Sequence, residues 1–528
     1  MGNWQSAIGN LLMLSWTIYL SFLGVLVLLL LPPGDARSAR GVALFSALGG
    51  LLCAIAGTLA APAGLFTITK VPWVKSLGIE YFLATDGISL VLVLLTGLAS
   101  VTGILFSWNI EHRAKEFFAL YLALIGGVYG VFLSFDLFTL FVFYELAIIP
   151  KYFLIAVWGS TRKEYGAMKL ALYSFVGSAM VLIGLVAAFV VAGGHSFNLV
   201  ELAKFPFPET FQKWAFPLVF VGFAILAGMW PFHTWAPTGH VAAPTAASML
   251  LAGVVMKLGA YGALRVAMTL FPLGLVAWQH ELALLAVIGI VGGAMVALTQ
   301  KDFKFVIGYS SVSHMGFVLL GLATLNTIGL SGAVLQMFSH GIIAGLLFGV
   351  VGRMVYDRTH TRELTVLEGM GLLKALPFAA VTFAIAAVAS MGLPGFSGFI
   401  AELQVLVGAW QSLPGFAVAS GVGIVIGVAY TLRALQKAFF ADEGGPGSTP
   451  APTGHSEGAG GIAPSQACSN DSGRGHTFEP ITIPERLGAA VLIFTTLLLG
   501  LYPKLLLDLI VPSLETPLFD ALRKGGLQ

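Results

Sequence analysis

Five ionisable side chains lie deep inside long apolar stretches of the sequence: Glu145, Lys151, Lys257, His340 and Glu402. A lone charge at the centre of a bilayer costs on the order of 3 kcal/mol, so we expect these groups to face one another or water. Carboxyl, ammonium and imidazole groups each gain and lose a proton, and series of such groups carry protons through membranes. The set therefore predicts a proton relay.

Three further histidines are predicted to support the relay. His233 and His240 flank a proline-rich segment, and His314 lies near the middle of a later apolar stretch. His233 and His240 could instead satisfy backbone groups that the prolines leave without helical partners. His314, like His340, could instead be a hydrogen-bonded histidine of the core.

The charged candidates also have structural interpretations. Glu145 and Lys151 are six residues apart, which places them about 240° apart around a straight helix. They would form an ion pair only if Pro150 bends that helix. Lys257 could reach an interface, although it lies near the middle of its apolar stretch, and Glu402 could cap a half-helix.

Three other charged residues are predicted to have structural roles. Asp86 and Asp136 stand at the starts of apolar stretches and are expected to be N-caps. Arg265 follows Lys257 by eight residues and is expected to reach an interface.

The composition indicates the class of protein. Hydrophobic residues make up 57% of the 528 residues and charged residues only 10%, whereas soluble domains contain about 25% charged residues. With a mean hydropathy of +0.91, the chain is predicted to be an all-α polytopic membrane protein, embedded in the lipid bilayer. A formal net charge of +2 does not indicate nucleic-acid binding, and Cys53 and Cys468 are too few for a disulfide framework or a Cys-ligated metal site.

Fourteen stretches of the sequence are apolar and long enough to cross a bilayer as helices, which takes about 20 residues each. No positively charged segment precedes the first stretch, so it is predicted to be a retained helix rather than a signal peptide. The predicted spans are 11–31, 41–61, 86–108, 116–134, 136–158, 167–193, 214–236, 244–270, 280–300, 303–324, 327–356, 376–410, 415–440 and 485–511.

Two of these spans are interrupted. The span 214–236 runs into Trp230-Pro231, and the span 376–410 contains Gly-Leu-Pro-Gly-Phe-Ser-Gly at 392–398. Broken helices at matching places in two halves are typical of transporters built from inverted repeats. We therefore predict two inverted five-helix repeats, formed by spans 4–8 and 9–13.

The predicted organisation has five parts. Residues 1–110 contain the first three helices, 111–270 and 271–440 the two repeats, and 485–528 the last helix with a C-terminal tail. Residues 441–484 are rich in Gly, Ser and Pro and are predicted to form a flexible loop. Lysine and arginine are about twice as frequent in the connections on the side of this loop, and such an excess marks the cytoplasm. Both termini are therefore expected on the non-cytoplasmic side.

Several motifs carry a family resemblance. Two neighbouring segments are the most distinctive, Pro231-Phe-His-Thr-Trp-Ala-Pro237 and Ala243-Pro-Thr-Ala-Ala-Ser248. Further motifs are Thr85 to Ser89, Phe143 to Leu146, Tyr152 to Gly159, Val255 to Gly262, Asp302 to Lys304, Ser311 to Phe317, His360 to Arg362 and Gly392 to Gly395. Together, over about residues 80–440, they resemble the antiporter-like membrane subunits of respiratory complex I (NADH:quinone oxidoreductase). The M-type subunit, the bacterial counterpart of mitochondrial subunit 4, is the most similar.

The resemblance implies a proton path through Glu145 on helix 5, Lys257 on helix 8, His340 on helix 11 and Glu402 on helix 12. It implies no cofactor in this chain, because flavin, Fe–S clusters and quinone belong to partner subunits. The implied neighbours are L-type and N-type antiporter-like subunits in a bacterial inner membrane.

One position departs from the family pattern. The family carries a lysine on helix 7, nine residues before the tryptophan of the broken segment, and Leu226 occupies that position here. Lys151 on helix 5 is unusual, and our hypothesis is that it takes over the missing role. The usual Leu-Pro-Asp-Ala-His is also changed, to Ala236-Pro-Thr-Gly-His240, which removes an acidic group.

Three functions remain open at this point. The first is a proton-translocating subunit of an NADH:quinone oxidoreductase, or of a relative with another electron donor such as a membrane hydrogenase. The second is a subunit of a multi-subunit Na⁺/H⁺ antiporter with the same fold. The third, suggested by Leu226, is a scaffold subunit whose proton path is vestigial.

Overall fold

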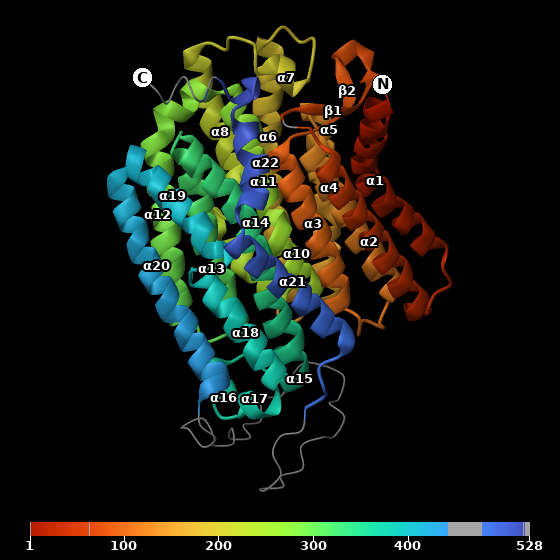
Figure 1. Cartoon of the computed structure of the whole chain (residues 1–528), viewed down its shortest axis with the longest axis vertical. Coiled ribbons are helices and arrows are strands. Elements are labelled where there is room, and N and C mark those ends of the chain that lie inside the picture. Colours follow the sequence, from red (N-terminus) through yellow and green to blue (C-terminus); the bar gives the residue numbers. More distant parts are fainter. Residues whose placement is uncertain (1, 63, 442–477, 521, 523–528) are drawn as a thin grey trace, which may run out of the picture.

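The computed structural model describes residues 2–62, 64–441, 478–520 and 522, and these form a bundle of long, roughly aligned helices (Figure 1). Within these residues, 13 helical segments are long and apolar enough to cross a membrane. The predicted class is therefore confirmed. The remaining predicted span, 376–410, consists of two shorter helices of 14 and 16 residues. Most of the predicted loop 441–484 lies outside the described residues.

The helices are named in chain order. They are α1 Gly2–Leu30, α2 Ala36–Ala60, α3 Gly87–Phe106, α4 Ala114–Leu133, α5 Leu137–Trp158, α6 Lys163–Val191, α7 Leu199–Leu202, α8 Glu209–Ala227, α9 Trp235–Ala242, α10 Thr245–Leu250, α11 Met256–Gly262, α12 Pro272–Thr299, α13 Phe303–Ala323, α14 Thr327–Gly349, α15 Asp357–Thr359, α16 Leu364–Leu367, α17 Leu372–Ala375, α18 Pro377–Ser390, α19 Ser397–Ser412, α20 Pro414–Leu435, α21 Ile483–Leu501 and α22 Lys504–Leu514. Short π-helical segments continue four of them, at Leu251–Val255, Ala263–Met268, Val350–Tyr356 and Gln436–Phe440.

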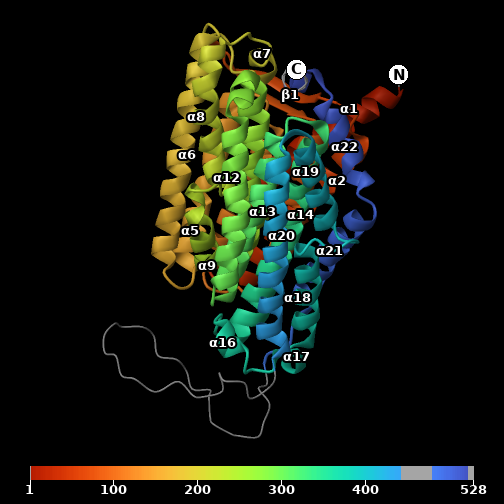
Figure 2. The ribbon, with the colours of Figure 1, turned by 90° about the vertical axis from the view of Figure 1, so that its left-hand side faces the viewer.

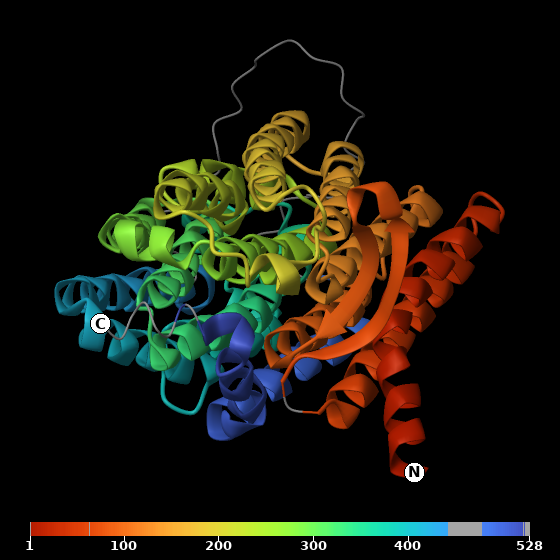
Figure 3. The same ribbon diagram turned by 90° about the horizontal axis from the view of Figure 1, so that it is seen from above.

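A β-hairpin connects α2 to α3. Strand β1 (Phe66–Val74) pairs antiparallel with β2 (Ile79–Thr85), and the hairpin lies across the ends of the first helices, in contact with α1, α4 and α5 (Figure 3). The sequence analysis did not anticipate this hairpin. Its two strands are rich in β-branched and aromatic residues, which favour strands, but they are too short and too polar to register as membrane spans.

The first predicted break is confirmed. Helix α8 ends at Ala227, Gly228 takes a left-handed conformation with φ 82°, and regular α-helix resumes only at Trp235. Carbonyl groups at the end of a helix need new donors. The buried Trp235 supplies one, because its Nε1 donates to the carbonyl of Ile225 at 2.8 Å.

The second predicted break is also present. Helix α18 ends at Ser390 and α19 begins at Ser397, and both Gly392 (φ 71°) and Gly395 (φ 99°) in the connection have left-handed conformations. Figure 2 shows α18 and α19 as the lower and upper halves of one interrupted path along the bundle. The inverted relation between the two repeats stays a prediction.

The last predicted span, 485–511, is wrong as a single helix. Helices α21 and α22 meet at Tyr502 and Pro503, because proline has no N–H to continue a helical hydrogen-bond ladder. Both helices pack on α3 and α14. The start of α1 and the end of α22 lie at the same end of the bundle, opposite α15, α16 and α17 (Figure 1).

Candidate functional site

Lys257 and His340 meet in the middle of the bundle. Nζ of Lys257 lies 2.7 Å from Nδ1 of His340 and donates to the carbonyl of Ala252 at 2.5 Å. Lys257 is fully buried, and His340 is 4% exposed. Helix α14 approaches the segment that carries Lys257 closely because Gly341 of α14 faces Gly253 of the π-helical segment Leu251–Val255. A Cβ on Gly341 would lie 2.6 Å from the carbonyl oxygen of Gly253.

A second polar group connects α13 with the broken helix. Nδ1 of His314 lies 3.0 Å from Oε1 of Glu402, and Nε2 lies 3.1 Å from the hydroxyl of Ser390. Gln336 approaches both Glu402 and His314, at 3.5 and 3.4 Å. Glu402 is in the second turn of α19, which begins at Ser397. The interpretation that Glu402 caps a half-helix is therefore wrong.

The two groups lie side by side. The ring centroids of His314 and His340 are 5.4 Å apart, and Nε2 of His340 and Oε1 of Gln336 have no hydrogen-bond partner within the described structure. A cavity of about 10 Å³, lined by these residues and Glu402, has room for roughly one water molecule. Lys257, His340, His314 and Glu402 thus form one buried polar series from α11 to α19.

The first half of the predicted relay is arranged differently. Nζ of Lys151 and Oε1 of Glu145 are buried and have no hydrogen-bond partner in the part of the chain that is described. Helix α5 continues through Pro150, and no ion pair forms between Glu145 and Lys151. The alternative interpretation of Glu145 and Lys151 as a structural ion pair is therefore wrong. Leu226 is buried, near the end of α8.

The two histidines at the first break are not hydrogen-bonding partners of freed backbone groups. His240 is fully buried, and neither of its ring nitrogens has a partner within the described structure. Its ring packs 5.2 Å from that of Phe348 and 6.2 Å from that of Trp235. Nδ1 of His233 is also unpartnered, and its ring lies 6.2 Å from that of Tyr309. No hydrogen bond within the described structure joins either side chain to the Lys257–Glu402 series.

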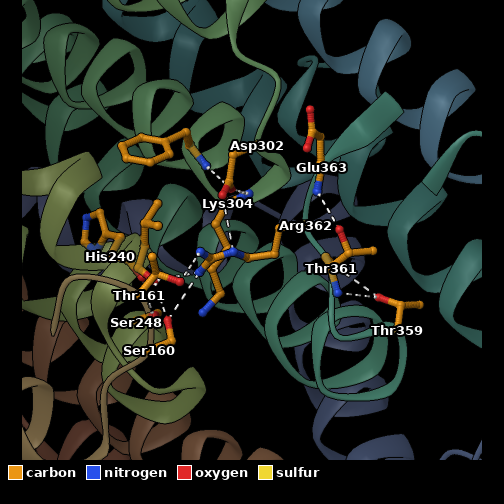
Figure 4. Close-up of polar contacts among 12 residues, drawn as sticks. Ser160, Thr161, His240, Ser248, Asp302, Lys304, Thr359, Thr361, Arg362 and Glu363 are labelled. Carbon is orange, nitrogen blue, oxygen red and sulfur yellow. Dashed lines mark hydrogen bonds and ion pairs between the residues drawn. The ribbon is translucent and has the colours of Figure 1, made fainter. Parts of the chain in front are cut away.

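Sequence reasoning missed a polar junction near His240 (Figure 4). The buried Arg362 donates to the carbonyl of Val241 at 3.0 Å and pairs with Asp302 at 3.2 Å. Its Nη atoms also reach the hydroxyls of Ser160 and Thr161, each at 3.3 Å. The junction thus joins the α5–α6 connection and the end of α9 to the segments around α13.

Lys304 belongs to the same region. It is 2% exposed, and its Nζ donates to the carbonyl of Ala243 at 3.3 Å. The sequence contained a signal for this junction. The motifs around Asp302 and Arg362 carried part of the family resemblance, but their residues were given no individual role.

The expectation for Arg265 is corrected. Arg265 is fully buried, its Nη2 lies 2.6 Å from Oδ1 of Asp86, and its Nε donates to the hydroxyl of Tyr261 at 3.2 Å. The expected N-caps are confirmed, because Asp86 accepts from the backbone N–H of Ser89 and Asp136 from that of Thr139, each at 2.9 Å. Asp86 thus caps α3 and neutralises a buried guanidinium.

Comparison with known proteins places this fold and these residues in a family. The family model described as "NADH:quinone oxidoreductase/Mrp antiporter, TM" matches residues 134–427. The NADH-quinone oxidoreductase subunit M of Rhodobacter capsulatus is 35% identical over 497 residues, covering 91% of this chain and 90% of that protein. The NAD(P)H-quinone oxidoreductase chain 4 1 of Synechococcus elongatus is 37% identical over 441 residues, 81% of each chain.

A solved structure supports the same family assignment. A chain of respiratory complex I from Thermus thermophilus with bound NADH superposes with a TM-score of 0.84 and 27% identity, over 98% of this chain and 100% of that chain. The family model spans more than half of this sequence, and the relatives align over most of their length. The chain therefore belongs to the NADH:quinone oxidoreductase/Mrp antiporter transmembrane family, as a member of the subunit M (chain 4) type.

Proposed function

We propose that this chain is the M-type membrane-arm subunit of a proton-translocating NADH:quinone oxidoreductase. We propose further that it carries protons along Lys257, His340, His314 and Glu402. The observation that supports this most is the continuity of the series. Lys257 is hydrogen-bonded to His340, the two histidine rings are neighbours, and His314 is hydrogen-bonded to Glu402.

Each step in this series is a proton transfer. Nζ of Lys257 gives a proton to Nδ1 of His340, which becomes an imidazolium and then releases a proton from Nε2. His314 accepts that proton, through a water in the adjoining small cavity, and passes one from Nδ1 to Oε1 of Glu402. At each step one N–H or O–H bond breaks and one N–H or O–H bond forms, so the chain itself needs no redox group.

The driving chemistry belongs to partner subunits. Flavin, Fe–S clusters and quinone bind there, and L-type and N-type antiporter-like subunits flank this chain. The end of the bundle with α15, α16 and α17 faces the cytoplasm of a bacterial cell, because the connections there have most of the lysine and arginine residues. Both termini then lie on the other side.

Lys151 on α5 takes the place of the lysine that the family carries at the position of Leu226 on α8, in the first half of the relay. It is 1% exposed and its Nζ has no partner within the described structure, while Leu226 fills the usual lysine position. A buried ammonium that no structural contact explains favours a functional role. Proton pumping by Lys151→Met with the complex assembled tests this point, and full pumping would refute the role.

The proposed function is tested in membrane vesicles that contain the native complex. We expect Lys257→Met and Glu402→Gln to lower the number of protons moved per quinone reduced while the subunit stays assembled. The matched control is Lys437→Met, which loses an ion pair with Glu368 at the surface, away from the series, and keeps the ratio. Unchanged proton movement in both relay variants would contradict the proposal.

The same preparation separates the alternatives. Flavin and Fe–S subunits that co-purify with the chain favour an oxidoreductase, whereas a set of small antiporter subunits favours the Na⁺/H⁺ antiporter. A requirement for Na⁺ gradients instead of quinone reduction would establish the latter. An assembled complex in which no relay variant changes ion movement would indicate a scaffold.

A further inference from the structure

Three buried hydroxyl groups meet where α14, α19 and α21 pack together. The hydroxyl of Ser397, the first residue of α19, lies 2.7 Å from that of Ser339 on α14 and 2.9 Å from that of Thr496 on α21. Each of the three residues is at most 1% exposed. A threonine inside a helix can instead bond a carbonyl of its own helix, as the neighbouring Thr495 does with Val491 at 2.8 Å. This hydroxyl cluster (Ser339, Ser397 and Thr496) therefore connects three separate helices.

The start of α19 is not fixed by a capping side chain. Phe396 occupies the N-cap position and forms no side-chain hydrogen bond to the first turn, because a phenyl ring offers no acceptor of the kind that N-cap residues provide. Residues 391–396 are not helical, so the hydrogen-bond ladder of α18 does not continue into α19. The hydroxyl of Ser397 supplies an anchor at this point.

Helix α21 packs directly against the second break. It lies beside both α18 and α19 (Figure 2) and also contacts α14. Gly500 on α21 allows this approach, because a side chain there would collide with the backbone of Gly395 and Phe396. The last helix, which the predicted relay does not include, is therefore in contact with the segment that leads into Glu402.

The hydroxyl cluster borders the proposed relay. Ser339 precedes His340 in the chain and lines the same small cavity as His340 and Glu402. Glu402 follows Ser397 by five residues, about 1.4 turns of helix, so a shift in the start of α19 would move Glu402 away from Nδ1 of His314, which lies 3.0 Å from it. A proton passes only between atoms about 2.6–3.2 Å apart or through one water, and small misplacements slow such steps strongly.

We propose that Thr496 is a positioning residue for the relay: through Ser397 its hydroxyl holds α19 where Glu402 reaches His314. This inference rests on the proposed relay and adds α21 to the elements that it needs. The cluster does not extend the proton path itself, because Thr496 is buried and its hydroxyl bonds only Ser397 within the described structure.

The variants Thr496→Val and Thr496→Ser separate the hydroxyl from the packing of the side chain. Valine keeps the shape of threonine without the hydroxyl, whereas serine keeps the hydroxyl without the methyl group. We expect Thr496→Val to lower the number of protons moved per quinone reduced in vesicles, by part of the loss that Glu402→Gln causes, and Thr496→Ser to keep the native number. The matched control is Thr495→Val, which removes a hydroxyl bonded only within its own helix and should also keep the native number.

The amount of assembled complex and its half-life on heating are measured on the same samples, because a purely structural role would change these and leave the proton number unchanged. If Thr496→Val does not assemble, Ser339→Ala, which removes the other partner of Ser397, replaces it with the same expectation. A native proton number in Thr496→Val, or an equal loss in Thr496→Ser, would overturn the positioning role. If Glu402→Gln also keeps the native number, the proposed relay fails. If Glu402→Gln lowers it and Thr496→Val does not, only the positioning role fails.

Discussion

Nζ of Lys257 lies 2.7 Å from Nδ1 of His340, a residue 83 positions further along the chain. The two residues come from the two predicted repeats, so this contact connects the halves. An ammonium group donates to an unprotonated imidazole nitrogen. The pair in this form carries one positive charge. A further proton on the imidazole would place two positive charges side by side in a buried site. In the proposed relay, this contact is where a proton passes from the first predicted repeat to the second.

Lys257→Arg tests whether the proton itself, rather than the charge, is required. Arginine keeps the positive charge but does not deprotonate in proteins. We expect assembly to be retained and the number of protons moved per quinone reduced in vesicles to fall by the share that this chain carries, because the flanking antiporter-like subunits are unchanged. Lys437→Arg at the surface is the matched control. Normal pumping by Lys257→Arg would show that this lysine acts only as a fixed charge.

The environment of His314 predicts a graded effect. His314→Ala removes the link between His340 and Glu402 and should abolish most pumping. Ser390→Ala removes only the hydroxyl 3.1 Å from Nε2 of His314, a bond worth about 1 kcal/mol, so the rate of pumping should fall only about fivefold. Both variants are measured by quenching of a pH-sensitive dye in energised vesicles. Equal effects would mean that the ring only fills space.

Restoring a lysine on helix α8 tests the relocation of the first relay group. We expect Lys151→Met to lose pumping and the double variant Leu226→Lys/Lys151→Met to regain it, because the ammonium returns to the family position. Leu226→Lys alone adds a second buried charge, which costs on the order of 3 kcal/mol, and should lower the amount of assembled complex. The relocation is wrong if the double variant pumps no better than Lys151→Met.

The Arg265–Asp86 pair predicts a stability effect without a specific pumping effect. Removing one partner of a buried ion pair costs about 3–5 kcal/mol, because the other charge is left uncompensated. Arg265→Ala should therefore shorten the half-life of the complex on heating, whereas Arg265→Met with Asp86→Leu should recover most of it. Lys213→Ala, which loses a half-exposed ion pair with Glu209, should change stability by less than about 1 kcal/mol. A heat half-life unchanged in Arg265→Ala would refute the structural role.

The sequence by itself determined the membrane class, most of the approximate spans, both helix breaks and the titratable groups of the predicted relay, but not the buried Arg265, Lys304 and Arg362. Each follows from a local rule. A bilayer requires about 20 apolar residues per helix, prolines and glycines interrupt helices, and a charge inside an apolar stretch is rare enough to stand out. The same local rules missed the hairpin. Its two strands pair with each other and are too short and too polar to register as membrane spans.

The partners of those groups were decided only by the tertiary structure. Arg265 lies eight residues past Lys257, about 12 Å along a helix, and distance along the chain suggested an interface. Arg265 instead forms an ion pair in the core with Asp86, the N-cap of α3. In the same way Lys257 meets His340, Glu145 and Lys151 do not meet, and Lys304 faces a cavity. The physical reason is that these contacts depend on which helix faces pack together, and a single chain's periodicity does not encode the neighbour of each face.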